Sequence, residues 1–273
     1  MKTIKQAIII LLVILAVANV ATYFYLGTSD TEVPPTISCP SEPLEISVAD
    51  VRNENAQLLL QDVVAQDAQD GDLTHRIFIG SISNLISNNM AKVTYLVFDS
   101  DNNVATCVRK IRYLDYQRPT FDVVEPLIFS PTEDVAMLSR LKATDVLDGN
   151  ISSNIRVSTL EPTSNSELYY VTVQVSNSSG DTSWVTLPVQ MLENDLNRPK
   201  IELKNYLIYV EKGADFKAHE YIDNVTVSGE SQSLLDVATD NPVDTGETGI
   251  YYVTYSYTAN GRTGVAILTV VVQ

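Results

Sequence analysis

The sequence predicts an all-β protein, in which three tandem β-sandwich domains follow one N-terminal transmembrane helix. An uncharged apolar run near the start predicts the helix, and an alternating strand–turn–strand pattern that occurs three times predicts the sandwiches. The chain has 273 residues, a net charge of −16 and two cysteines. This composition excludes a basic nucleic-acid-binding surface and a scaffold built on many disulfides.

Residues 1–27 have the features of a membrane anchor. Lys2 and Lys5 precede an apolar run over residues 7–26 that carries no charge. A helix of that length spans about 30 Å, the thickness of the hydrocarbon core. The positive-inside rule then predicts a single-pass membrane protein with a cytoplasmic N-terminus and with residues 28–273 extracellular. The alternative is a signal peptide cleaved after the small residues 16–18, which would make the protein secreted.

Three segments align as β-hairpins, each with two alternating strands around a polar turn. They are Lys92–Leu114, Tyr170–Leu192 and Tyr252–Gln273, with turns at 99–103, 177–181 and 259–262. A proline-containing segment precedes each copy, so the predicted domains cover 33–116, 117–196 and 197–273 after a linker at 28–32. Residues 54–65 are interpreted as a strand because their end is β-branched. Short junctions with proline predict that successive domains stack end to end.

A further motif lies between the start of each copy and its hairpin. Residues 67–74 read DAQDGDLT, residues 145–152 read DVLDGNIS, and the third copy keeps only DNVT at 223–226. With the PPTISCP and DSDNNVATC segments of the first copy, this pattern resembles bacterial surface immunoglobulin-like domains of the type found in hyalin repeats and pesticidal crystal proteins. The resemblance implies three Ig-like sandwiches and an extracellular setting, and it implies no activity.

The positions of the two cysteines, Cys39 and Cys107, resemble the cysteine positions of hyalin repeats. In the other copies Cys39 aligns with Val123 and Leu203, and Cys107 aligns with Val185 and Ile267. These are apolar strand positions, so both cysteines are expected to face the core on neighbouring strands of an Ig-like sandwich. A disulfide is expected in an oxidising compartment, and two buried free thiols are the alternative.

Acidic residues concentrate in two loops that share one end of an Ig-like sandwich. In the first copy they form a possible calcium site, and at the first junction they form a possible interdomain cluster. The calcium set is Asp67, Asp70, Asp72, Asp99 and Asp101, and the junction set is Asp115, Asp145, Asp148 and Asp181. The alternative is that these residues simply form turns, or that Arg76, Arg118 and Arg156 pair with the carboxylates. No other cofactor is expected.

Trp184 is expected to face outward, because its neighbour in the alternating strand faces the core. An exposed tryptophan can anchor a glycan or protein partner, and packing under a loop or a neighbouring domain is the alternative. No catalytic motif is present, so no catalytic residue is assigned. The predicted function is a non-enzymatic, membrane-anchored cell-surface stalk or adhesion module. The alternative is a carbohydrate-binding or cell-envelope-associated accessory subunit.

Overall fold

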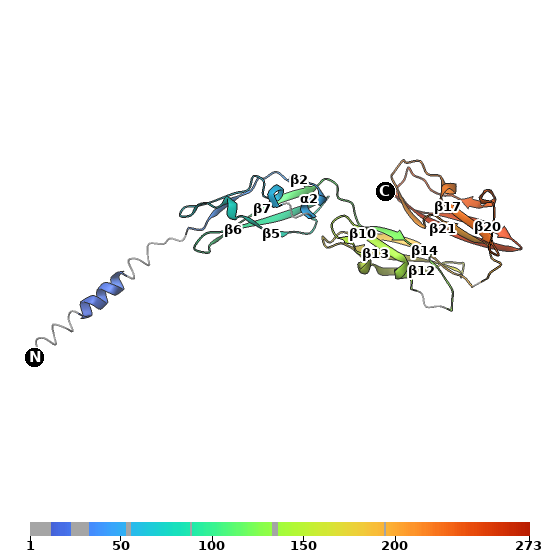
Figure 1. The fold of residues 1–273 in the computed structure, drawn as a ribbon, viewed down its shortest axis with the longest axis horizontal. Coiled ribbons are helices and arrows are strands. Elements are labelled where there is room, and N and C mark those ends of the chain that lie inside the picture. Colours follow the sequence, from blue (N-terminus) through green and yellow to red (C-terminus); the bar gives the residue numbers. More distant parts are fainter. Residues whose placement is uncertain (1–11, 23–32, 53–55, 88, 133–135, 194) are drawn as a thin grey trace, which may run out of the picture. The chain divides into compact units, whose positions relative to one another are not determined.

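The part of the chain that the structure describes is all-β, with its strands in six sheets of three or four strands each (Figure 1). The structure, a computed structural model, describes residues 12–22, 33–52, 56–87, 89–132, 136–193 and 195–273. Each sequence repeat contributes one three-stranded and one four-stranded sheet. This arrangement is consistent with tandem β-sandwich domains.

The first repeat contains the sheets β1-β3-β4 and β2-β7-β6-β5. Its strands are β1 (Thr36–Ser38), β2 (Leu44–Ile46), β3 (Val64–Asp67), β4 (Gly71–Asp72), β5 (Phe78–Ile82), β6 (Met90–Phe98) and β7 (Val104–Tyr113). Short helices α2 (Val48–Arg52), α3 (Ala56–Leu59) and η1 (Thr74–Arg76) connect them. The predicted strand over 54–65 is therefore wrong for most of its length, because α3 buries Leu59 and only the last residues join β3.

The second repeat contains the sheets β11-β10-β8 and β12-β13-β14-β9. Its elements are β8 (Thr120–Val123), β9 (Ile128–Phe129), η2 (Met137–Arg140), β10 (Leu141–Asp145), β11 (Gly149–Asn150), η3 (Ser152–Asn154), β12 (Arg156–Pro162), β13 (Leu168–Ser176) and β14 (Thr182–Met191). Buried side chains from both sheets form one core, so the two sheets pack face to face.

The third repeat contains the sheets β15-β17-β18 and β16-β21-β20-β19. Its elements are β15 (Lys200–Leu203), β16 (Leu207–Val210), η4 (Ala218–Tyr221), β17 (Ile222–Val227), β18 (Glu230–Ser231), η5 (Leu234–Asp236), β19 (Ala238–Asp240), β20 (Gly249–Ala259) and β21 (Arg262–Val272). Its core also draws on both sheets.

The three predicted hairpins are confirmed as β6–β7, β13–β14 and β20–β21. The third turn is shorter, since Ala259 pairs directly with Arg262. As a result Ala266 lies opposite the buried Tyr255, where Val185 lies opposite Val173 in the second repeat. The sequence alignment of Ile267 with Val185 is therefore wrong by one residue, and a shift of one residue turns a side chain to the other face of its sheet.

A disulfide joins Cys39, which follows β1, to Cys107 on β7, and so links the two sheets of the first repeat. Both cysteines are half-buried. Cys107 lies opposite the fully buried Tyr95 and therefore on the core-facing side of its sheet, as the sequence predicts. A link across 68 residues stabilises the fold by about 4 kcal/mol in the chain-entropy model.

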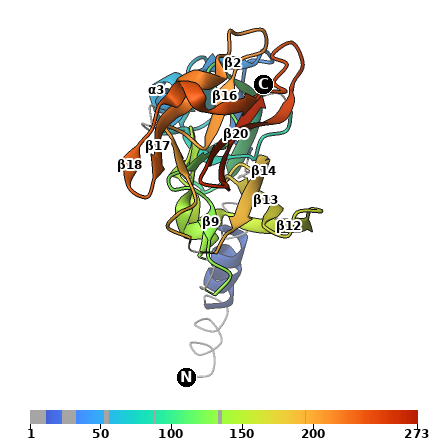
Figure 2. The same ribbon diagram turned by 90° about the vertical axis from the view of Figure 1, so that its right-hand side faces the viewer.

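The second and third repeats belong to one compact unit, which holds residues 113–273 with the short segments 46–53 and 84–89. Strand β21 is buried on both faces. Leu268 and Val270 face the core of the third repeat, whereas Ile267 and Thr269 face the other way and are 9% and 0% exposed. The outer face of the third repeat's larger sheet therefore has a packing partner, and that partner is the second repeat. Figure 2 shows strands β16 and β20 of this sheet from a second direction.

Tyrosines of the third repeat bond to backbone groups of the second. The Tyr209 hydroxyl accepts a hydrogen bond from the N–H of Phe121 on the edge strand β8 at 2.9 Å. The Tyr252 hydroxyl donates to the carbonyl of Thr186 on β14 at 3.1 Å, and its ring lies 4.8 Å from that of Tyr170. The predicted end-to-end stacking is therefore wrong for these two repeats, which pack laterally.

The predicted anchor helix over residues 7–26 lies only partly within the described residues. Residues 12–22 are helical, and their apolar side chains, such as Leu12, Leu15 and Val17, are more than half exposed. Within the described part of the chain, we find no helix with both the length and the apolar character needed to cross a membrane.

Candidate functional site

The acidic motif at residues 67–72, DAQDGD, forms a tight loop between β3 and β4 in the first repeat. Asp67 Oδ1 accepts hydrogen bonds from the N–H groups of Gln69 and Asp70, both at 2.8 Å, and Asp72 Oδ1 accepts from Thr74 N–H at 2.9 Å. These backbone bonds lower the pKa of Asp67, and hydrogen bonds from Thr74 lower the pKa of Asp72. Both carboxylates therefore act as Asx turns that shape their own loop.

The remaining carboxylate of the motif ties this loop to the β6–β7 hairpin. Asp70 accepts from both N–H and Oγ of Ser100, at 2.6 and 2.8 Å, and Arg76 lies 3.6 Å from it. The neighbouring Asp99 is 5% exposed and accepts from the N–H groups of Asp101 and Asn103. The two acidic loops are thus joined through Asp70 and Ser100, and the Asp70 and Asp99 carboxylates are bonded to N–H and O–H donors.

The second repeat reproduces the turn bonds and the aspartate–serine bonds of this arrangement. Asp145 Oδ1 accepts from the N–H groups of Leu147 and Asp148, and Asn150 Oδ1 accepts from Ser152 N–H. Asp148 binds both N–H and Oγ of Ser178, as Asp70 binds Ser100. The shared motif therefore bonds its own loop to the hairpin turn. This structural role is sufficient to explain why its polar residues are present.

Within the described residues, no group of three or more His, Cys, Asp or Glu side chains is placed to hold a metal ion. Four carboxylates of the predicted calcium set, those of Asp67, Asp70, Asp72 and Asp99, accept hydrogen bonds from backbone N–H groups. Two of the three arginines named as alternative partners do pair with the acidic loops: Arg76 with Asp70 and Arg118 with Asp181. Arg156 instead donates to the carbonyls of Ser153 and Ile155.

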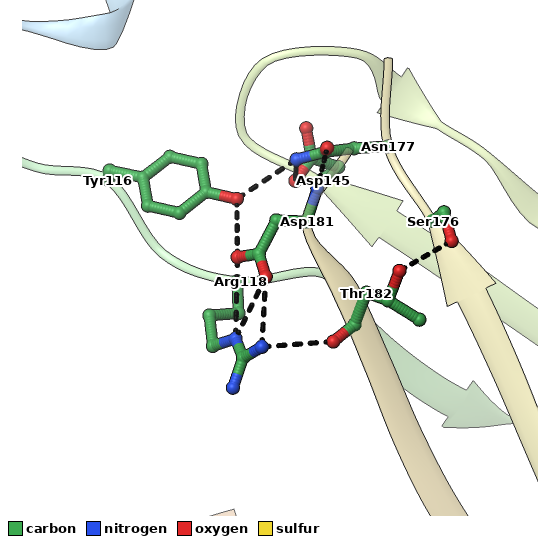
Figure 3. A network of polar contacts seen from close by, with 7 residues as sticks. All are labelled: Tyr116, Arg118, Asp145, Ser176, Asn177, Asp181 and Thr182. Atoms are coloured by element: carbon green, nitrogen blue, oxygen red, sulfur yellow. Dashed lines mark hydrogen bonds and ion pairs between the residues drawn. The ribbon is translucent and has the colours of Figure 1, made fainter. Parts of the chain in front are cut away.

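A polar network joins the start of the second repeat to its hairpin turn (Figure 3). Tyr116 donates to Asp181 Oδ2 at 2.8 Å and accepts from Asn177 Nδ2 at 2.9 Å, and Asn177 also donates to Asp145 Oδ2 at 3.1 Å. Arg118 lies 2.9 Å from Asp181 and donates to the carbonyl of Thr182. The chain that enters the repeat is thus bonded directly to its hairpin turn.

Electrostatics favours the ionised form of Asp181 in this network. Burial by itself disfavours the carboxylate, but hydrogen bonds from Arg118 and Tyr116 outweigh it, so the pKa of Asp181 is lowered. Burial, with the adjacent Asp181, raises the pKa of Tyr116, so this phenol stays a donor at neutral pH. Hydrogen bonding to Asp181 raises the pKa of Arg118. The guanidinium of Arg118 is therefore the cation that balances the charge of Asp181 in this network.

The predicted junction set of four aspartates is only partly brought together. Asp145 and Asp181 both belong to the network, which Asn177 and Tyr116 connect. Asp148 accepts a hydrogen bond from Ser178, the residue after Asn177. Asp115 is bonded elsewhere, to the N–H of Val48 at 2.8 Å. Sequence reasoning did not identify Tyr116 and Asn177 as members, although Tyr116 follows Asp115 directly and Asn177 begins the turn that ends at Asp181.

Trp184 lies on the outer face of β14 and is 55% exposed. Its indole N–H donates to Oε1 of Gln174, its partner on β13, at 3.1 Å. Hydroxyl pairs Ser176–Thr182 and Thr172–Thr186 lie in the neighbouring cross-strand pairs of the same two strands. This surface therefore combines one oriented aromatic ring with amide and hydroxyl groups.

Comparison with protein families gives no match to any family model. A protein of Acholeplasma phage L2, named "Uncharacterized 81.3 kDa protein", is 25% identical over 171 residues. The match covers 60% of this chain and 22% of the phage protein, so this chain spans about a fifth of that relative.

Solved structures give two kinds of partial likeness. One is the M60 catalytic domain with the CBM51-1 and CBM51-2 domains of Clostridium perfringens ZmpB, at 15% identity and a TM-score of 0.24, covering 88% of this chain and 31% of that one. The other is Drosophila N-cadherin EC1-4, at 14% identity and a TM-score of 0.21, covering 70% and 58%. Scores this low do not place the chain in either family.

The polar network predicts a specific acid sensitivity. The folded-state pKa of Asp181 lies below its ordinary value of 3.8, so its contribution to stability is complete above that pH and is lost as the pH falls through the folded-state pKa. We expect Asp181→Asn to lower the free energy of unfolding at pH 7 by about 1–3 kcal/mol and to flatten its decline in acid. Urea unfolding at a series of pH values measures both effects.

The matched control for this experiment is Asp122→Asn, which changes an exposed aspartate on β8 of the same repeat. It should leave the pH profile close to that of the unaltered protein. Equal profiles for Asp181→Asn and Asp122→Asn would show that the network contributes nothing to stability.

Proposed function

We propose that this chain is an exported, membrane-attached and non-enzymatic interaction protein, whose sandwiches present a binding surface outside the cell. The observation that carries the proposal is the apolar N-terminal segment: its described part, residues 12–22, is a helix whose apolar side chains are exposed. Such a surface is unfavourable in water and favours insertion of the whole run over 7–26 into a bilayer.

Two further observations support this proposal. The disulfide between Cys39 and Cys107 suits an oxidising, exported compartment. The polar clusters of the first two repeats bond loops to hairpins. Their carboxylates therefore have a structural role, which supports a non-enzymatic protein. In this proposal the N-terminus is cytoplasmic, and residues 28–273 are outside.

Protease added to intact bacterial cells that express the full chain tests this address. We expect a tag at the C-terminus to be lost without lysis, while a tag at the N-terminus stays in the membrane fraction and is protected. A C-terminal tag that is degraded only after lysis would contradict export. A soluble exported form that begins near Asn19 would instead establish cleavage of a signal peptide.

A second candidate function, glycan binding, is favoured by the surface around Trp184. The indole is exposed and held in place by Gln174, with hydroxyl pairs beside it on the same two strands. The apolar face of a pyranose ring packs on an aromatic ring, and its hydroxyls bond to amides and hydroxyls at the rim. An outer sheet face that carries these groups therefore suits a saccharide.

Sedimentation of the full chain with insoluble polysaccharides, including peptidoglycan and chitin, tests glycan binding. We expect Trp184→Ala to weaken binding about tenfold or more, as for an aromatic residue at the centre of an interface. The control Leu235→Ala removes an apolar side chain that is 95% exposed in the third repeat, and it should have no effect. Retention of binding by Trp184→Ala would remove this surface from consideration.

A further inference from the structure

The second repeat has one edge strand that is open to solvent along its whole length. β12 lies at the end of the sheet order β12-β13-β14-β9, and all seven of its residues are exposed. They include two large apolar side chains, Val157 at 49% and Leu160 at 62% exposed. An edge strand of this kind presents backbone groups and side chains that can pair with another strand.

The opposite side of the same sandwich is covered. Tyr209 bonds to the N–H of Phe121 on β8, and Tyr252 bonds to the carbonyl of Thr186 on β14. The third repeat thus occupies the backbone groups that would otherwise be open on that side. Among the described strands of the larger sheet, β12 is the edge that no neighbouring repeat covers in this way.

A β-bulge gives β12 an unusual distribution of side chains. Its pairing with β13 shifts between Val157 and Thr159, which leaves Ser158 as the extra residue. Val157 and Leu160 therefore both lie opposite buried residues of β13, on the core side of the sheet. In a regular strand two residues three positions apart would lie on opposite faces.

The same bulge places the two charged residues of β12 together on the outer face. Arg156 lies opposite Gln174 and Glu161 lies opposite Tyr170, and these two β13 residues both alternate with its buried valines. Among the described residues, neither Arg156 nor Glu161 forms an ion pair, although Arg156 donates to two nearby carbonyls. Both charges remain exposed.

These positions make the strand complementary to itself. In an antiparallel pair of two β12 strands centred between Ser158 and Thr159, Arg156 lies opposite Glu161 of the other copy, and Val157 lies opposite Leu160. Opposed residues must share a face, and the bulge meets this condition for both kinds of pair. The result is two ion pairs on the outer face and two apolar pairs on the core side.

An apolar groove beside β12 adds surface for such a partner. It has a volume of about 570 Å³ and is lined by residues of η2, including Met137 and Leu138, together with Val157, Leu160 and the buried Val171. Apolar side chains of a second β12 strand on the core side would cover the mouth of this groove. The groove therefore favours the same orientation as the charges.

We infer that two copies of this chain associate through β12, as an antiparallel pair in which Arg156 of each copy bonds to Glu161 of the other. The equivalent edge strands are less suited to this pairing: β5 has the same kind of bulge but no charged residue, and β19 has only three residues. Self-association extends beyond the proposed function, since it depends neither on a ligand nor on the membrane. The paired segment is short, so we expect micromolar association.

Charge-swap variants of the full chain in detergent, analysed by sedimentation velocity across the micromolar range, test the pairing. Arg156→Glu and Glu161→Arg should each weaken dimerisation about tenfold or more, because each replaces two attractions with two repulsions. The double variant should restore it. Mixing the two single variants should also restore dimers, since a mixed pair again sets opposite charges against each other.

Lys142→Glu is the matched control, because it changes the charge by the same amount on β10 of the other sheet. It should leave the dimer unchanged, and thermal melts should show that all variants stay folded. If the bulge and Pro162 instead keep this edge unpaired, the unaltered chain will be monomeric throughout, which overturns the inference. The inference is also overturned if either single variant dimerises as well as the unaltered chain. It is equally overturned if the two single variants do not form dimers when they are mixed.

Discussion

The packing of the third repeat on the side of the second is the interaction on which the rest of this unit depends. Tyr209 and Tyr252 each bond to a backbone group of the second repeat, one on each of its sheets. Between them Ile267 and Thr269 of β21 lose their exposure to water. Burial of apolar surface provides the driving force, and the tyrosine hydroxyls satisfy polar groups that would otherwise be buried without partners. The outcome is one side of the second repeat closed and β12 left open.

The acidic loops, by contrast, are held by hydrogen bonds within each repeat. A carboxylate that accepts two N–H groups shapes its own turn, and a second carboxylate three residues later holds the hairpin through a serine. At the start of the second repeat Arg118 and Tyr116 extend this bonding to the incoming chain. A net charge of −16 is thus compatible with tight loops, because many of the carboxylates accept hydrogen bonds from the backbone. Clustering of acidic residues in a sequence therefore does not by itself distinguish turns from a metal site.

Features set by local periodicity could be predicted from the sequence, whereas features set by tertiary packing could not. Alternation and turn residues correctly located the three hairpins, and the repeat alignment correctly joined Cys39 to Cys107. The alignment failed at Ile267, because a shorter turn changed the register and an apolar residue has the same sequence signature in a core and in an interface. Lateral packing was missed for the same reason, since the alternating pattern of β20 is the same whether Tyr252 faces solvent or another repeat. The bulge in β12 leaves no mark in the sequence.

Hydrogen exchange of the full chain, measured by mass spectrometry, tests most directly whether the second and third repeats stabilise each other. The comparison is between the unaltered chain and Tyr252→Ala, with Tyr251→Ala as a control in the same strand, since Tyr251 bonds within its own repeat to Glu247. Loss of the interface should accelerate exchange in both 117–196 and 197–273, with β14 among the affected segments. Acceleration confined to 197–273 would show that the repeats are independent and would contradict this account.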